Sequence, residues 1–311
     1  MESEILLKVC GLKQYFKVGK RTFKAVENVS FEVKKGEVFA LVGESGSGKT
    51  TTGRAIVGLN EITAGEIRFE GEKIGSGKRI SKKERIRLAQ NVQMIFQDPI
   101  ASLNPRMTVG EIVAEGIRIQ GVKGKKEIEE KVKSALRMVG LLPEYASRYP
   151  HEFSGGQRQR IGIARAVIIE PKMIIADEPV SALDVSVQAQ VINLLGDLKK
   201  SLGLTVLFIA HDLSVVKYFS DRIAVMYLGR ILEQAPTEEL FKNPLHPYTK
   251  SLFSAIPLPD PNAEKKRKRI PYEPMESGEE LNGSRTLLEV FPEHYVFCTQ
   301  QEADAFREKK K

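Results

Sequence analysis

One octapeptide constrains this chain more than any other feature. Residues 43–50 read Gly-Glu-Ser-Gly-Ser-Gly-Lys-Thr and fit the phosphate-binding loop pattern G-x-x-x-x-G-K-[ST] without a mismatch. The apolar run Val38–Val42 precedes this loop and is typical of a buried parallel strand. The glycines let consecutive backbone N–H groups curl around phosphate oxygens, and the helix that follows would present its N-terminus to the same anion. The pattern predicts a P-loop nucleoside triphosphatase and leaves kinase, GTPase, motor and transporter open.

Two side chains of the loop have distinct expected roles. Lys49 would hold the β- and γ-phosphates, and the hydroxyl of Thr50 would ligate Mg²⁺. Backbone N–H groups of the loop would supply further contacts. The expected nucleotide-binding residues of this segment are Gly43, Glu44, Ser45, Gly46, Ser47, Gly48, Lys49, Thr50 and Thr51.

Length and charge set broader limits. The 311 residues can bury one large core and a small extension. The formal net charge of +8 suits an anionic ligand or an acidic membrane surface, but a solvated exterior is the simplest interpretation. The two cysteines, Cys10 and Cys298, cannot build a disulfide framework and indicate a reducing compartment, by default the cytosol.

Nothing in the sequence predicts a segment that enters a membrane. No apolar run approaches the ~20 residues that a spanning helix needs. The start Met1–Glu4 lacks the basic residues of a signal peptide. We therefore expect membrane association to come through a partner.

Three further apolar runs are typical of strands, and a residue capable of phosphate or metal chemistry follows each one. Ligands of a parallel α/β sheet bind beyond the carboxyl ends of its strands, so these residues would meet at one edge if the strands share a sheet. The runs and the residues after them are Val92–Phe96 with Gln97, Met173–Ala176 with Asp177 and Glu178, and Val206–Ala210 with His211.

These strand-end residues have different expected roles in Mg²⁺ binding and nucleotide hydrolysis. Asp177 is placed to hold Mg²⁺ through water, and Glu178 is placed to accept a hydrogen bond from the water that attacks the γ-phosphate. Alternatively, Glu178 is a helix-capping acid before Pro179. Gln97 would contact Mg²⁺ or the attacking water, and His211 would donate to the γ-phosphate. A lone glutamine or histidine is ordinarily structural, but their position at strand ends favours a role in the site.

A second candidate phosphate cradle follows Phe153. The segment Ser154-Gly155-Gly156-Gln157 precedes a run with helical apolar spacing, so Ser154 is a plausible N-cap. Two glycines at a helix start allow an anion to approach the backbone closely. On physical grounds alone the segment could equally be only a capped helix.

Over roughly residues 5–235 the chain resembles an ATP-binding-cassette (ABC) ATPase. The signature of that family usually begins with leucine, whereas this chain has Phe153, a conservative departure. The resemblance implies that Ser154 and Gly156 touch the γ-phosphate of ATP on a facing subunit, and that Asp184 lies in a loop crossing the interface between two cassettes. It rests on the combination, in chain order, of Gly43–Thr50, Gln97, Ser154-Gly155-Gly156-Gln157, Asp177-Glu178, Ser181-Ala182-Leu183-Asp184 and His211.

The same resemblance implies an upstream aromatic residue that stacks on adenine. Tyr15 is the favoured candidate and Phe16 the rival. Because side chains alternate along a strand, only one of them can face the base. Either could instead belong to the core.

The expected fold is an α/β P-loop domain of the ABC type. A RecA-like core would carry an antiparallel β flap built from Leu6–Tyr15, Ala25–Val33 and Gly65–Glu70, whose side chains alternate between apolar and polar. Residues 98–155 would form the helical subdomain, in which Thr108 and Glu111 make a capping box and Glu127–Val139 is an amphipathic helix. We expect the ABC ATPase domain to span residues 1–235, with Asp184 capping a helix that ends at Gly203.

Residues 236–311 would form a C-terminal extension and a flexible tail. Asn243–Pro257 resembles the extension of oligopeptide and dipeptide importers and their nickel and oligosaccharide relatives. Pro257–Glu280 is rich in proline and charge and should be flexible, with Lys265–Arg269 a solvated charge run rather than a lipid or nucleic-acid site. Many relatives carry a cysteine-rich tail resembling an iron–sulfur site, but Cys298 is the only tail cysteine here, so we expect no cluster.

The resemblance implies the ATP-hydrolysing subunit of an importer at the cytoplasmic face of the cell membrane, with ATP and Mg²⁺ as cofactors. Expected partners are a second ABC ATPase, in a heterodimer or a homodimer, permease subunits and an extracytoplasmic solute-binding protein, but no nucleic acid. Peptide is the first expected substrate and a β-linked oligosaccharide the second. A soluble ABC ATPase of translation or DNA repair is the alternative, and a P-loop kinase would leave Ser154–Gln157 and His211 unexplained.

Overall fold

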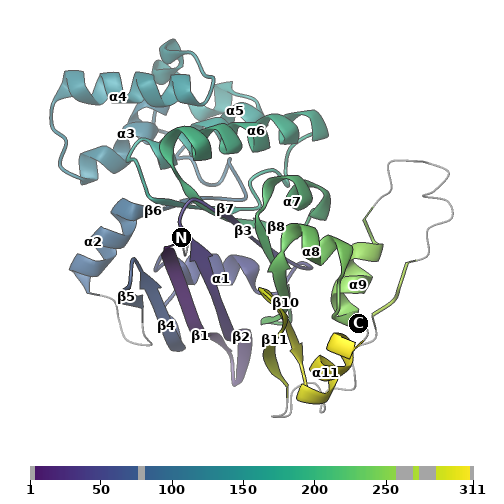
Figure 1. Ribbon diagram of the computed structural model, residues 1–311. Coiled ribbons are helices and arrows are strands. Elements are labelled where there is room, and N and C mark those ends of the chain that lie inside the picture. The colour runs from purple at the N-terminus through teal and green to yellow at the C-terminus, as the bar shows by residue number, and fades with distance from the viewer. Residues whose placement is uncertain (1–3, 76–80, 257–268, 273–284, 309–311) are drawn as a thin grey trace.

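An eight-stranded sheet runs through the middle of the molecule, and a four-stranded sheet lies beside it (Figure 1). The computed structural model describes residues 4–75, 81–256, 269–272 and 285–308. In spatial order the strands of the large sheet are β11 (Thr286–Phe291), β12 (His294–Cys298), β10 (Arg230–Pro236), β9 (Arg222–Tyr227), β3 (Val38–Val42), β8 (Thr205–Ala210), β7 (Met173–Asp177) and β6 (Val92–Ile95).

The parallel part of this sheet confirms the expected grouping of strands. β3 pairs with β8, β8 with β7, and β7 with β6, all in parallel. Every residue of β3, β7 and β8 is buried, as their unbroken apolar composition predicts. The carboxyl ends of the four strands therefore meet at one edge, where the site residues follow them.

The small sheet is the expected antiparallel flap, with one strand more than predicted. Its order is β2 (Arg21–Lys34), β1 (Ile5–Val18), β4 (Ala64–Phe69) and β5 (Glu72–Gly75). β5 was not anticipated, because its four residues Glu-Lys-Ile-Gly show no clear alternation. The buried side chains of the flap pack with those of α1 (Lys49–Ile56) and of the large sheet in one apolar cluster.

A group of helices covers the β6–β7 edge of the large sheet at the top of Figure 1. Thr108 caps one of them, and the reciprocal bonds with Glu111 confirm the expected capping box. The helix expected from Glu127 begins two residues earlier and ends at Met138. These elements are α3 (Val109–Ile119), α4 (Lys125–Met138), α5 (Gly155–Val167) and the short 3₁₀ helices η1 (Pro143–Ser147) and η2 (Pro150–Glu152). α2 (Lys82–Asn91) lies apart from them, at the left of the figure, and contacts β6 and β5.

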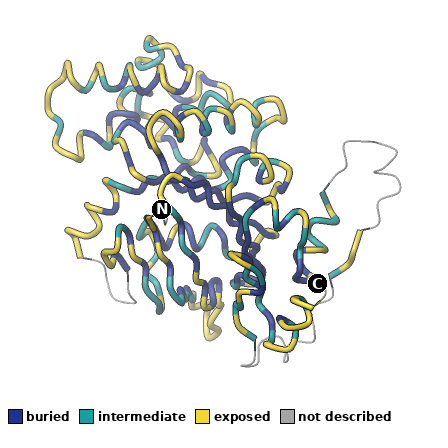
Figure 2. Tube along the Cα trace, viewed as in Figure 1, coloured by how far each residue is buried: buried dark blue, intermediate teal, exposed yellow. Residues whose placement is uncertain are grey.

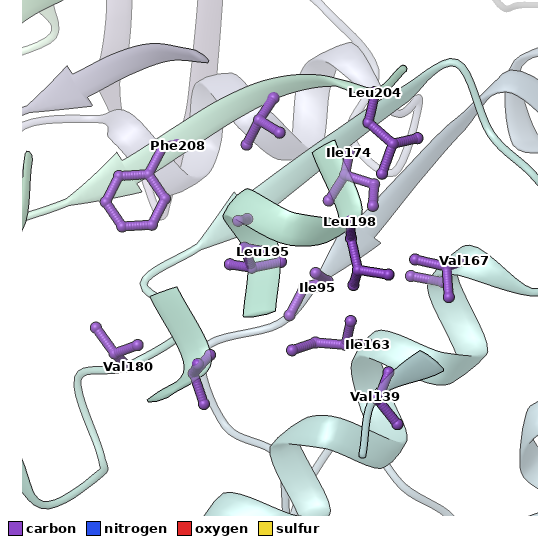
Figure 3. Close-up of a cluster of buried hydrophobic side chains, with 14 of the residues drawn as sticks. Ile95, Val139, Ile163, Val167, Ile174, Val180, Leu195, Leu198, Leu204 and Phe208 are labelled. Carbon is purple, nitrogen blue, oxygen red and sulfur yellow. The ribbon is translucent and has the colours of Figure 1, made fainter. Parts of the chain in front are cut away.

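The helical group and the sheet share a continuous core. Figure 2 shows the central strands buried and the outer helix faces exposed. In Figure 3, side chains from β6, β7 and β8 meet those of α5 and of α6 (Val185–Leu202). This packing fixes α5 relative to the strand ends that carry the site. α7 (Leu213–Phe219) follows β8 and packs through Val216 and the Phe208–Phe219 ring contact.

The C-terminal region extends the same sheet. α8 (Thr237–Lys242) and α9 (Pro247–Ser254) follow β10, and β12 then pairs with β10. With α11 (Gln300–Glu308), the hairpin β11–β12 gives residues 286–308 of the expected tail regular secondary structure. The expected flexible segment Pro257–Glu280 lies outside the described residues except for 269–272. Across the described ranges, no helix has the length and apolar character to cross a membrane.

Candidate functional site

The phosphate loop joins β3 to α1 and forms one wall of a cavity of about 500 Å³. The other walls come from the flap strand β2 and from the ends of β6, β7 and β8. The structure thus brings together segments that the sequence separates by more than a hundred residues. The cavity is lined by Phe23, Ala25, Ser45, Gly46, Gly48, Lys49, Thr50, Thr51, Gln97, Glu178 and His211.

The loop starts at a position that only glycine can occupy. Gly43 has φ 148°, and a Cβ there would lie 2.1 Å from the backbone oxygen of Met226. The first peptide of the loop therefore packs directly on the end of β9. This close contact explains why the loop begins immediately after β3.

Lys49 is held at the bottom of the loop. Its Nζ donates to the backbone oxygens of Gly43 and Glu44, each at 2.8 Å, and contacts Oγ of the buried Ser47 at 3.3 Å. Burial lowers the pKa of Lys49, while the nearby carboxylates of Glu178, Asp177 and Glu44 oppose that shift. A buried cation at a helix start is suited to hold phosphate oxygens.

The donors expected for Mg²⁺ lie together. Thr50 Oγ1 donates to Asp177 Oδ1 at 2.8 Å, and burial raises the pKa of Asp177. Among the described residues, no group of three or more His, Cys, Asp or Glu side chains could hold a metal. One carboxylate, one hydroxyl and substrate phosphates nevertheless fit Mg²⁺, which keeps several waters and needs few protein ligands.

Glu178 is the centre of the expected catalytic group. Gln97 Nε2 donates to Glu178 Oε2 at 2.8 Å, and His211 Nδ1 lies 3.1 Å from the same oxygen. The backbone of Glu178 is left-handed, with φ 45°, a strained conformation that is frequent at functional sites. The Glu178 side chain is 13% exposed and reaches the cavity, where it contacts Gln97 and His211, and these contacts favour the role in the site over that of a helix-capping acid before Pro179.

The signature segment lies outside this cavity. Ser154 caps α5 as expected, accepting a bond from Gln157 N at 3.3 Å while Gln157 Oε1 accepts from Ser154 N at 3.0 Å. Ser154 and Gly155 are exposed. A Cβ on Gly156 would lie 2.5 Å from Cγ1 of Val187, so this glycine permits α5 to pack closely on α6. The start of α5 therefore lies open at the surface.

Asp184 occupies the N-cap position of α6, as predicted, but its side chain makes no capping bond. The cap acts through the backbone oxygen, which accepts from Val187 N and Gln188 N, each at 2.9 Å, and the residue is exposed. The helix ends at Gly203 in the left-handed conformation, as expected.

The two candidates for adenine stacking have different surroundings. The hydroxyl of Tyr15 donates to Glu27 at 2.7 Å, and burial and that contact raise its pKa to about 12. Phe16 is 37% exposed and lies opposite Phe23 in the β1–β2 register. Phe23 lines the nucleotide cavity, whereas neither Tyr15 nor Phe16 does. Phe23 was missed because only the strand register places it beside the phosphate loop.

Cys298 is a buried free cysteine. It lies on β12, and burial raises its pKa to about 11. A thiolate is the form that ligates iron, and this environment disfavours it. The expected lack of an iron–sulfur cluster remains a prediction.

Comparison with known proteins agrees with this geometry. Residues 26–181 match the ABC transporter family, and residues 232–285 match the C-terminal region of oligopeptide/dipeptide transporters. The oligopeptide transport ATP-binding protein OppF of Bacillus subtilis is 57% identical over 98% of this chain and 99% of its own length. AmiF of Streptococcus pneumoniae, also an oligopeptide transport ATP-binding protein, is 55% identical over 96% of this chain and 97% of its own length.

A dipeptide transport protein and solved cassettes extend the comparison. DppF of Lactococcus lactis is 52% identical over 98% of both chains. The dimeric ATP-binding cassette MJ0796, in a post-hydrolysis state with ADP and Pi, is 29% identical with a TM-score of 0.68 over 75% of this chain and 99% of its own. The cbiO1 protein from Clostridium perfringens, part of an ABC transporter complex, is 30% identical with a TM-score of 0.67 over 77% of this chain and 92% of its own.

Proposed function

The chain belongs to the ABC transporter family, with the C-terminal region of the oligopeptide/dipeptide transporters, and we propose that it powers a peptide importer. It is an ATPase subunit of an ABC importer. The names of its relatives refer to oligopeptide or dipeptide transport, which supports peptide as the cargo and gives the oligosaccharide alternative no support. The alternative of a soluble ATPase in translation or DNA repair is not favoured.

The observation that carries this proposal is the convergence of Gln97 and His211 on one oxygen of Glu178 beside the phosphate loop. With one carboxylate oxygen held, the other would accept a hydrogen bond from the attacking water. The water oxygen forms a bond to the γ-phosphorus and the bond to the β,γ-bridging oxygen breaks, so ADP and inorganic phosphate leave. Mg²⁺ held by Thr50 and Asp177 would neutralise charge on the β- and γ-phosphates.

The contact of His211 Nδ1 with Glu178 limits which ring nitrogen can reach the nucleotide. If Nδ1 donates to Glu178, only Nε2 is left to face the γ-phosphate. A neutral imidazole carries one N–H, so donating at both nitrogens requires the imidazolium form. We propose that His211 orients Glu178 through Nδ1 and presents Nε2 to the γ-phosphate.

A second cassette would complete the reaction site. The cavity around Lys49 contains none of the signature residues 154–157, and Ser154 is exposed at the start of α5. We propose that α5 of one cassette faces the phosphate loop of another, and that ATP is bound between them. The dimeric MJ0796 cassette supports this pairing for a related fold.

A large groove lies between the sheet and the helical group, and we propose it as the permease contact. Its volume is about 1040 Å³, and α2, α3 and α5 contribute to its walls. Three apolar side chains along it are exposed, at 57% for Leu59, 49% for Ile86 and 79% for Ile119. A groove with exposed apolar positions suits an amphipathic helix. A short helix of a permease loop is the occupant that a transporter would supply.

This groove is connected to the catalytic group through adjacent residues. Phe96 lines the groove, and the next residue, Gln97, donates to Glu178. A helix that displaces Phe96 would therefore also move Gln97 relative to the catalytic carboxylate. The connection offers a route from permease movement to ATP hydrolysis. Such a subunit would sit peripherally on the cytoplasmic face of the membrane, opposite an extracytoplasmic peptide-binding protein.

The proposal is tested by peptide uptake into vesicles that contain the permease and both cassettes. Ile119→Asp would replace an exposed apolar side chain of the groove by a charged one, and we expect uptake to fall at least about tenfold because the docked helix loses an apolar contact and covers a charge. ATP binding by the purified chain should stay within about twofold. Met138→Asp, on α4 and 37% exposed, is the matched control. Normal uptake by the groove variant would remove the groove from the mechanism.

A further inference from the structure

The C-terminal region reaches the phosphate loop through one buried tyrosine. The backbone N–H of Glu44 donates to the hydroxyl oxygen of Tyr248 at 3.3 Å, across 204 positions of sequence. Tyr248 belongs to α9 and is 1% exposed. The contact is partly buried, because Tyr248 is buried whereas Glu44 is exposed, and it helps to fix the loop.

The other end of the same peptide group is held by Lys49. The peptide that joins Gly43 to Glu44 presents its oxygen to Lys49 Nζ at 2.8 Å and its N–H to Tyr248. The oxygen and hydrogen of a trans peptide point in opposite directions. Tyr248 and Lys49 therefore form hydrogen bonds with opposite sides of one peptide group. The position of Lys49 thus depends on a peptide group that Tyr248 helps to fix.

Tyr248 is itself tightly positioned by aromatic packing. Its ring lies 4.4 Å from that of Tyr227, at the end of β9, and 5.3 Å from that of Tyr272. Met226, next to Tyr227, is the residue whose backbone oxygen packs against Gly43. The tyrosine and the start of the loop thus share one support, and the hydroxyl has little freedom to move away.

The local sequence explains how α9 aims this hydroxyl. His246 Nδ1 accepts from Tyr248 N at 3.1 Å and caps the helix, and Pro247 occupies its first position. Burial raises the pKa of Tyr248 to about 12, so the hydroxyl is neutral at physiological pH. The contact to Glu44 is consequently a neutral hydrogen bond whose strength should not vary between pH 6 and 9.

A second buried contact ties α9 to the C-terminal hairpin. Glu233 of β10 accepts from Leu245 N at 2.7 Å and from His246 N at 3.0 Å. His294 Nε2, on β12, lies 2.8 Å from the same carboxylate, and both side chains are fully buried. The segment that begins α9 is therefore fixed by the strand that the hairpin extends.

We propose that Tyr248 is a positioning residue for ATP binding, through which the C-terminal extension holds the first peptide of the phosphate loop in place for Lys49. The inference rests on the proposed nucleotide-binding role of that loop. The His246-Pro247-Tyr248 segment would thus support the phosphate loop from behind, because Tyr248 contacts the loop backbone without lining the nucleotide cavity.

The test replaces only the hydroxyl. For Tyr248→Phe we expect the dissociation constant for ATP, measured on the full-length chain, to rise about 2- to 10-fold, because the partly buried Glu44 N–H loses its acceptor. The turnover rate at saturating ATP, measured with the partner cassette, should stay within about twofold. Tyr295→Phe removes a hydroxyl from the same extension at a different cavity and should change neither value. Lys49→Ala serves as the reference for a failed phosphate contact.

Each outcome separates the possibilities. The inference would be overturned if Tyr248→Phe bound ATP as tightly as the unaltered chain. It would also be overturned if Tyr295→Phe lost as much ATP affinity as Tyr248→Phe, because the extension would then act only through general stability. Normal ATP affinity in Lys49→Ala would instead reject the proposed phosphate site, and this inference with it. Thermal unfolding of both phenylalanine variants should also be measured without nucleotide. A hydroxyl with only a structural role would lower the melting temperature and leave the ratio of KM to kcat unchanged.

Discussion

Two helices of this chain, α1 and α5, begin at glycine-containing loops, yet their surroundings differ. At the start of α1, Lys49 is 4% exposed and bonded to backbone oxygens, and Thr50 already contacts Asp177. At the start of α5, Ser154 is exposed and exchanges bonds only with its own first turn, through Gln157. The two starts also differ in backbone, left-handed at Gly48 and extended at Ser154, and they give a cavity in one place and an open surface in the other.

This difference indicates that the two helix starts have different roles in nucleotide binding. The α1 site gathers cation, hydroxyl and carboxylate groups, so we expect it to bind a nucleotide without a partner. The start of α5 offers a helix N-terminus without a buried lysine, so under our proposal it acts only on a nucleotide that another cassette holds. Variants at the two sites should therefore fail in different assays.

The largest effect is expected at Glu178. Glu178→Gln keeps the shape of the side chain but removes the charge that orients the attacking water, so single-turnover hydrolysis at saturating ATP should fall about 10²- to 10⁴-fold. ATP binding should be unchanged. Glu170→Gln is a matched control, since Glu170 is exposed and also has a left-handed backbone, with φ 55° against 45° for Glu178. A loss below threefold in the Glu178 variant would remove this residue from its role.

Lys49 should show the next largest effect, on affinity. Lys49→Ala deletes the buried cation of the loop, and we expect ATP to bind about 10- to 100-fold more weakly, the range typical of a lost charge-assisted hydrogen bond. Equilibrium binding to the isolated chain measures this directly. Lys126→Ala, on an exposed face of α4, should bind ATP normally. Unchanged affinity in Lys49→Ala would contradict the idea that the α1 site is complete within one chain.

Ser154 provides the reverse test. In Ser154→Arg a bulky side chain would enter the space meant for the γ-phosphate of the facing subunit, so ATP-driven closure of the two cassettes should be reduced at least about tenfold. ATP affinity of the isolated chain should be unchanged, because Lys49 and Thr50 lie in a separate cavity. The measurements are nucleotide affinity and oligomer mass with ATP, in the presence of the second cassette.

Ser134→Arg adds the same side chain to an exposed position of α4 and serves as the control. Normal closure and turnover in Ser154→Arg would leave Ser154 as a simple helix cap. The open α5 surface would then have no part in ATP binding, and the contrast between the two helix starts would be one of packing alone.

Sequence reasoning succeeded where the chemistry is local or follows from a parallel sheet. Gln97, Glu178 and His211 were predicted together because each follows a buried strand, and the ends of parallel strands meet at one edge. The capping boxes at Thr108 and Ser154 depend on residues three positions apart, so the sequence also predicts them.

It failed where contacts depend on the pairing of distant segments. β12 pairs with β10 across about sixty positions, and the residue pattern of His294–Cys298 does not predict which strand it pairs with. The approach of Tyr248 to Glu44 needs the placement of α9 on β10. Phe23 reaches the cavity only through its register with β1. Such contacts are set by packing, which a single sequence does not encode locally.

The smallest expected effect concerns adenine and decides between Tyr15 and Phe16. Phe16 lies opposite Phe23, which lines the cavity, whereas the hydroxyl of Tyr15 is engaged with Glu27. We therefore expect Phe16→Ala to weaken ATP binding about fivefold, near the lower end of the range for losing one aromatic–base stack. Tyr15→Ala should have a smaller effect on affinity, since its ring is held by polar contacts on the flap.

Inorganic tripolyphosphate separates base stacking from phosphate binding, because it has the phosphates of ATP but no base. Its affinity should be unchanged in Phe16→Ala and reduced in Lys49→Ala, since only the lysine contacts phosphate. If Tyr15→Ala instead weakens ATP more than Phe16→Ala and spares tripolyphosphate, Tyr15 is the stacking residue and the β1 strand must turn its other face to the base. If both variants bind ATP normally, Phe23 is the remaining aromatic side chain that lines the cavity within the described residues, and Phe23→Ala should then show the loss.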